Sequence, residues 1–146
     1  MAQQTCLDYA LHYISRYPKT ESELKIKLMQ KGYFSNDIEK AMNILKEKKF
    51  LSDELFVESY VRSELMNKGK PPIAIIKKLQ EKGADKHLIM KIIKQNEEDV
   101  NSGVRERIKK EIASYKKRGE EGFDIIQKLM RKGYRLGDIK DVINNK

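Results

Sequence analysis

The sequence predicts an all-α protein made of three tandem three-helix repeats of about 50 residues, which form an elongated, curved array. A phrase of the form Lys-Leu-x-x-Lys-Gly occurs three times, at intervals of 51 and 50 residues, and ends at Gly32, Gly83 and Gly133. Helix-favouring residues dominate, there are only three prolines, and the alternation typical of strands is absent. Because such a unit cannot bury its apolar face alone, neighbouring repeats are expected to stack.

Residues 1–50 are predicted to form the first repeat. Its first helix covers about 6–16, where apolar residues recur at intervals of three and four, and Pro18 ends it. A capping box at Thr20 to Glu23 starts the second helix, which runs to about Lys31. The third helix is expected from Ser35, as its N-cap, to about residue 48.

Residues 51–94 repeat this plan. Ser52 or Asp53 is expected to cap a helix through about Asn67, and this helix buries Phe56 on its inner face. Gly69 breaks the helix, and a proline pair begins the next one, since the first helical position needs no N–H donor. That second helix closes at the repeated glycine. The third helix follows a cap at Asp85 and is filled by Leu88, Ile89, Ile92 and Ile93.

Residues 95–103 are polar and end in glycine, so they are predicted to form a flexible connection. Residues 104–146 are predicted to form the third repeat, which opens with a helix from about Val104 to Arg118. The next two helices are marked by apolar residues at helical spacing: Ile125, Ile126 and Leu129 in one, and Ile139, Val142 and Ile143 in the other.

The repeated phrase has two interpretations. A buried leucine, a lysine near the carbonyl end and a glycine just beyond describe an ordinary helix ending, with the glycines in left-handed backbone conformation. Alternatively, the paired cations show a common face to phosphates along an anionic filament. The candidate binding residues in the three copies are Lys27, Lys31, Lys78, Lys82, Lys128, Arg131 and Lys132.

The charge is strongly basic, at +9, which favours an anionic partner. It is also uneven, because the segments 1–50, 51–100 and 101–146 carry +3, 0 and +6. In the last of these segments, Arg105, Lys109 and Lys116 lie within about 40° of one another on a helix. These three residues are therefore further candidates for binding nucleic acid or an acidic surface.

Other residue types suggest no catalyst. Cys6 is the only cysteine, which excludes an intramolecular disulfide and a multi-cysteine metal site. His12 and His87 stand in unrelated surroundings, and no nucleotide-binding, zinc-protease or serine-nucleophile motif occurs. We therefore expect no enzyme and no cofactor. Without a signal peptide or an apolar run of about 18 residues, we expect a cytoplasmic protein.

The tyrosines divide into two expected groups. Tyr9, Tyr60 and Tyr115 lie on or beside apolar helical stripes and are predicted to pack in the core. Tyr33 and Tyr134 directly follow repeated glycines and are predicted to be the more exposed pair, available for stacking on bases.

Three phrases in this order resemble the RecX family of regulatory proteins. The first lies between Ser22 and Gly32, the second is the run 50–61 (FLSDELFVESYV), and the third is Gly69-Lys70-Pro71-Pro72-Ile73 with Leu79 and Lys82-Gly83. The resemblance covers nearly the whole chain and is most specific between Leu51 and Gly83.

The resemblance implies a non-enzymatic modulator that binds the RecA filament on single-stranded DNA. Such a protein would inhibit the strand exchange, ATPase and co-protease activities of the recombinase, in DNA repair and the SOS response. We expect a monomer that acts away from membranes, with duplex DNA as a further partner. The alternative is a free-standing DNA-binding protein built from helix-turn-helix-like modules. A scaffold that contacts only protein is a third interpretation.

Overall fold

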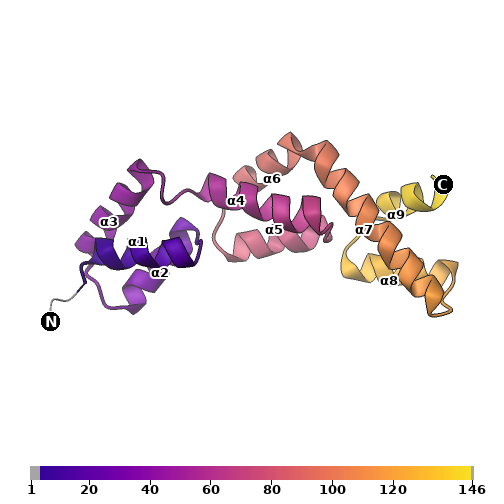
Figure 1. Cartoon of the computed structure of the whole chain (residues 1–146), viewed down its shortest axis with the longest axis horizontal. Helices are drawn as coiled ribbons and strands as arrows, with labels where there is room; N and C mark the ends of the chain where they lie inside the picture. Colours follow the sequence, from indigo (N-terminus) through magenta and orange to yellow (C-terminus); the bar gives the residue numbers. More distant parts are fainter. Residues whose placement is uncertain (1–3, 146) are drawn as a thin grey trace.

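The computed structural model describes residues 4–145, and every regular element within this range is a helix. Figure 1 shows an elongated, gently arched row of helices, with the termini at opposite ends. The all-α class is therefore confirmed. The described residues form nine α-helices and one π-helical segment: α1 (Cys6–Arg16), α2 (Glu21–Gln30), α3 (Ser35–Glu47), α4 (Asp53–Val61), η1 (Arg62–Asn67), α5 (Pro72–Glu81), α6 (Lys86–Gln95), α7 (Glu97–Lys117), α8 (Gly122–Lys132) and α9 (Leu136–Asn144).

Most of the predicted helix caps are present. Thr20 and Glu23 form the complete capping box, and Ser52 and Asp85 accept hydrogen bonds from the backbone N–H groups of the third residues of α4 and α6. One cap differs from the prediction. Phe34 occupies the N-cap of α3, and Ser35 is already the first helical residue.

The repeated glycines have left-handed backbones, as the sequence predicts. Gly32, Gly83 and Gly133 have φ values of 88°, 93° and 108°, which only glycine adopts without strain. The ordinary interpretation of the repeated phrase, as a helix ending, is thus confirmed.

Buried side chains form two separate cores. Helices α1 to α3 enclose the first core, which contains Leu24, Leu28 and Leu45. The second core is continuous from α4 to α9, so the second and third groups of helices share it. Phe56 packs at the edge of this second core, and its ring stacks on Tyr60 with 6.0 Å between ring centroids.

The predicted flexible connection at 95–103 is wrong. Only Asn96 separates α6 from α7, and residues 97–103 are helical. Two features explain this helix. Its acidic first turn is stabilised by the positive end of the helix dipole. In addition, Val100 is buried one turn before Val104 and extends the same apolar stripe. The third helical group therefore begins at residue 97.

The second helix of each group meets the second helix of the preceding group end to end. A Cβ placed on Gly83, after α5, would lie 2.4 Å from the Cβ of Ser22 in α2. A Cβ on Gly133, after α8, would lie 2.9 Å from Cγ2 of Ile73 in α5. Ser22 and Ile73 are 51 residues apart, so both contacts use equivalent positions of the repeat. We call this contact the repeat joint.

Polar groups complete the first joint. The buried Thr20 hydroxyl donates a hydrogen bond to the carbonyl of Lys82, whose ammonium lies 3.6 Å from the Glu23 carboxylate. The backbone N–H of Glu21 donates to Asp53 Oδ1 at 2.8 Å. Burial raises the pKa of Asp53, and this hydrogen bond opposes the increase. Asp53, predicted as a structural residue, thus links α4 to α2.

Replacing Gly83 by alanine should destabilise the protein more than replacing Gly32. Both positions have positive φ, for which a Cβ costs roughly 1 kcal/mol. Only at Gly83 would the new Cβ also collide with Ser22, because nothing among the described residues lies within 4 Å of a Cβ at Gly32. We expect an additional loss of about 1 kcal/mol or more for Gly83→Ala. Urea denaturation followed by circular dichroism measures both variants, and equal losses would contradict a tight joint.

Candidate nucleic-acid interface

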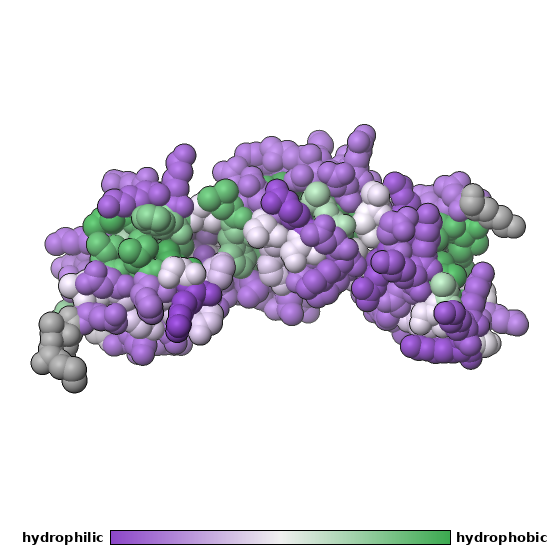
Figure 2. All heavy atoms as spheres, in the orientation of Figure 1, coloured by the Kyte–Doolittle hydropathy of each residue, from purple (hydrophilic) through white to green (hydrophobic). Residues whose placement is uncertain are grey.

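Helix α7 presents the predicted basic face. Its buried stripe contains Val104, Ile108 and Tyr115, and Ile112 is half-buried beside them. Arg105, Lys109 and Lys116 are all exposed on the outer side. Lys109 makes an ion pair with Glu106 at 3.3 Å, and no ion pair is formed by the other two within the described chain. In Figure 2 the region of α7 is covered almost entirely by hydrophilic side chains.

The same helix carries more exposed cations than the sequence reasoning selected. They are Arg107, Lys110, Lys117 and Arg118. Arg107 is paired with Glu111 at 3.2 Å. A count of charges along 104–118 finds these residues, whereas helical periodicity selects only the cations on one face.

In the first helical group, the repeated lysines lie over tyrosine rings. The ammonium of Lys27 is 5.4 Å from the ring centroid of Tyr13, and that of Lys31 is 5.3 Å from Tyr9. The Tyr13 ring also contacts Tyr9 and Tyr17, with centroids 5.9 Å and 5.4 Å apart. Tyr9, predicted in the core, is half-buried. The two lysines at the end of α2 thus lie over tyrosine rings of α1, a pairing that the spacing within one helix does not reveal.

The corresponding lysines of the third group make contacts within the protein. Lys128 and Lys132 lie 5.3 Å and 5.5 Å from the ring centroid of Tyr115. Lys132 also donates to Glu111 at 2.8 Å, and this hydrogen bond raises the pKa of Lys132. Lys128 makes an ion pair with Glu120. Binding of phosphate by these lysines would therefore compete with internal contacts.

The remaining candidates of the repeated phrase lie apart. Lys78 on α5 and Arg131 on α8 are exposed, whereas Lys82 takes part in the first repeat joint. The three lysine pairs therefore have three different surroundings. Among the predicted site residues, Arg105, Lys109 and Lys116 are three exposed cations on one helix, α7.

The prediction of an exposed Tyr33 and Tyr134 pair is wrong for Tyr134. This side chain is only 4% exposed, and its hydroxyl donates to the Gly69 carbonyl at 2.7 Å. The cause is the second repeat joint, which covers the residue following Gly133. Tyr33 is half-buried, and its hydroxyl makes a longer bond of 3.3 Å to the Gln4 carbonyl.

The structure offers no obvious metal centre in residues 4–145, because no cluster of three or more histidine, cysteine or acidic side chains occurs there. Cys6 is buried, and burial raises the pKa of its thiol, so a reactive thiolate is disfavoured. No helix in this part of the chain is long and apolar enough to cross a membrane.

Comparison with known proteins identifies the family. Residues 6–45 match the first three-helix domain of RecX, and residues 52–91 match the second. The chain is 33% identical over 138 residues to the regulatory protein RecX of Legionella pneumophila (strain Corby), covering 94% of this chain and 89% of that protein. It is 31% identical over 143 residues to the regulatory protein RecX of Clostridium perfringens (strain SM101), covering 94% of this chain.

The fold agrees with a solved structure. The crystal structure of RecX from Lactobacillus salivarius superposes with a TM-score of 0.81, covering 95% of this chain and 92% of that chain at 23% identity. The chain spans about two thirds (66%) of the length of the Clostridium perfringens relative. The two domain matches cover more than half of the sequence, and the Legionella relative is aligned over most of its length. The chain therefore belongs to the RecX family of regulatory proteins.

Proposed function

We propose that this chain binds the RecA recombinase filament on single-stranded DNA and inhibits its ATPase, strand-exchange and co-protease activities. Membership of the RecX family, whose named relatives are regulatory proteins, is the observation that carries this proposal. The protein would regulate by binding and not by catalysis, in the cytoplasm, during DNA repair and the SOS response.

The elongated shape of the chain favours binding to a partner that is also extended. An elongated row of helical groups provides a long contact surface, as solenoid proteins do, and this suits a filament groove better than a small ligand. The basic face of α7 could contact phosphates of the DNA or an acidic surface of the recombinase. We propose Arg105, Lys109 and Lys116 as the main charged contacts, because all three are exposed on one helix and, among the described residues, only Lys109 makes an ion pair there, with Glu106.

An ATPase assay of the host recombinase on single-stranded DNA tests this function. Adding increasing amounts of the purified chain should lower the rate of ATP hydrolysis, and an equal amount of a basic protein of similar charge should not. A recombinase activity that stays constant at a molar excess of the chain would overturn the proposal.

The alternative of a free-standing DNA-binding protein predicts a different result in a pull-down. Under that alternative the chain is retained equally by naked DNA and by recombinase-coated DNA. Under the proposed function, retention is markedly stronger on the coated DNA.

A further inference from the structure

The repeat joint occurs twice among the described residues, and at each end of the described row one half of it has no partner among these residues. In the joints, Ser22 lies against Gly83 and Ile73 lies against Gly133. In the third group, the residue equivalent to Ser22 and Ile73 is Phe123 at the start of α8. The Phe123 side chain is 72% exposed. The matching glycine at the other end is Gly32, beside which the described chain leaves open space.

An ion pair of the first joint also has equivalent residues at the two ends of the row. In the first joint Glu23 faces Lys82 at 3.6 Å. The residue equivalent to Glu23 at the free start of α8 is Asp124, and the residue equivalent to Lys82 at the free end of α2 is Lys31. Both are exposed, and their charges are again opposite. An end-to-end contact between two copies would therefore place the Asp124 carboxylate beside the Lys31 ammonium.

A hydrogen bond of the second joint likewise has equivalent residues at the two ends of the row. There the Tyr134 hydroxyl donates to the carbonyl of Gly69, which ends the first helix of the preceding group with φ of 64°. The equivalent residues at the free ends are Tyr33 and Gly119, and Gly119 also ends its helix with a positive φ of 84°. Three residue pairs across the two ends thus correspond to contacts of the internal joints. The ion pair occurs only in the first joint, since the second has Ala74 in place of Glu23, and the tyrosine bond occurs only in the second, since the first has Ala84 in place of Tyr134.

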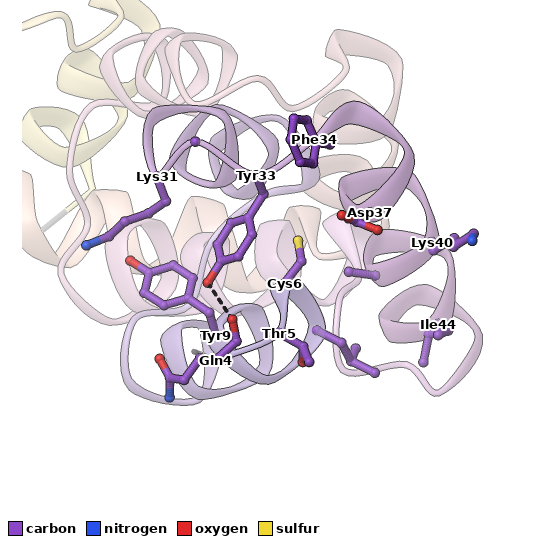
Figure 3. A pocket seen from close by; sticks show the side chains of 13 residues that line it. Gln4, Thr5, Cys6, Tyr9, Lys31, Tyr33, Phe34, Asp37, Lys40 and Ile44 are labelled. Carbon is purple, nitrogen blue, oxygen red and sulfur yellow. Dashed lines mark hydrogen bonds between the residues drawn. The ribbon is translucent and has the colours of Figure 1, made fainter. Parts of the chain in front are cut away.

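A pocket lies beside the C-terminal end of α2. Figure 3 shows it between the start of α1, the segment after α2 with Lys31, Tyr33 and Phe34, and the part of α3 with Asp37 and Lys40, and its volume is about 830 Å³. In the other two groups, the residue after the repeated glycine, Ala84 or Tyr134, is buried, and the Tyr134 hydroxyl bonds to Gly69 of the preceding group. Tyr33 is only half-buried, which is expected if a covering group is missing at this position.

We infer that a second copy of this chain covers this end. The start of α8 in one copy would dock at the pocket beside Gly32 of the next, with Phe123 over the glycine and Asp124 beside Lys31. This contact is heterologous, so repeating it produces an open row of copies instead of a closed dimer. The inference goes beyond the proposed function and does not depend on it.

The strength of the contact depends on how the two halves are held together. The internal joints consist of a few side chains held together by the covalent chain, which supplies a high effective concentration. Between separate copies the same contact lacks this advantage. The chain should therefore be monomeric in dilute solution and form rows at high concentration, or where a filament holds copies side by side.

Carbodiimide cross-linking provides a direct test, because the reagent joins a carboxylate to an adjacent lysine. Unlabelled and ¹⁵N-labelled chains are mixed at about 1 mM, a concentration similar to the effective concentration that a short linker provides. The mixture should give an Asp124–Lys31 cross-link between a labelled and an unlabelled chain. The internal Glu23–Lys82 pair, at 3.6 Å, is the positive control within every molecule. If mass spectrometry finds only the internal cross-link at this concentration, the inference is wrong.

A charge exchange tests the same contact in a second way. Asp124→Lys and Lys31→Glu should each reduce end-to-end association in sedimentation velocity, because one joint pair then carries like charges. An equal mixture of the two variants should restore association, since each end then meets an opposite charge. If the mixture associates no better than the single variants, the proposed pairing is wrong.

The apolar part of the contact has its own variant and control. Phe123→Glu should lower the association constant about tenfold or more, because it places a charge against Gly32 and removes the aromatic contact. Phe50→Glu changes a similarly exposed phenylalanine between α3 and α4, away from both ends, and should leave association unchanged. Equal effects of the two substitutions would contradict a specific joint.

Discussion

Replacing Gly103 by alanine should destabilise the protein by about 2 kcal/mol or more, although alanine is the better helix former by about 1 kcal/mol. Gly103 lies inside α7 where this helix crosses η1. A Cβ at this position would be 2.4 Å from the carbonyl oxygen of Met66 and 2.6 Å from that of Leu65. These atoms belong to the backbone, so they cannot move aside as a flexible side chain does. The two helices would have to separate.

The matched control is Gly137→Ala in α9. Gly137 is also helical, but nothing among the described residues lies within 4 Å of a Cβ there. This substitution should be neutral or should stabilise the protein by up to about 1 kcal/mol. Urea denaturation followed by circular dichroism compares the two variants. A Gly103→Ala protein as stable as the Gly137→Ala protein would show that the crossing is looser than described.

Reversing Arg105, Lys109 and Lys116 to glutamate should produce the largest loss of binding to the filament or to DNA. The change alters the local charge by six units and leaves the buried stripe of α7 in place. Folding should survive, because exposed substitutions typically change stability by no more than about 0.5 kcal/mol each. If each residue contacts one phosphate, the slope of log affinity against log salt should fall by about 0.7–0.9 per contact.

A second triple variant separates specific contacts from total charge. Lys77, Lys91 and Lys94 are exposed lysines of the second helical group, and their reversal changes the net charge equally. This control should retain most of the affinity and the salt dependence of the original chain. If both triple variants bind equally well from low to high salt, the α7 cations only keep the protein in solution.

The parts of the fold that were predicted correctly depend on residues close together in sequence. The capping box at Thr20 and the left-handed glycines need only the geometry of one helix end, and these local requirements are visible in a few consecutive letters. The prediction of a loop at 95–103 is wrong because it depends on the polar composition of this segment and ignores the apolar Val100 within it. That single apolar residue is buried in the core shared by the second and third groups.

The candidate site was harder to predict because the surroundings of a lysine depend on distant residues. Lys27 and Lys128 occupy equivalent positions of the repeat, yet one lies over Tyr13 and the other between Tyr115 and Glu120. Tyr134 is buried by a contact with Gly69, 65 residues earlier. No pattern within one repeat specifies such partners, since they arise only when the groups of helices pack against each other.

The division into two cores also determines how the molecule can bend. The first core is joined to the rest mainly through polar contacts around Thr20, Glu23 and Asp53, while α4 to α9 share apolar side chains. Opening the polar contact exchanges hydrogen bonds for bonds with water, at about 1 kcal/mol each, whereas opening the shared core exposes apolar surface. Residues 4–50 should therefore rotate as one unit against α4 to α9. Such a rotation would change the curvature of the molecule without partial unfolding.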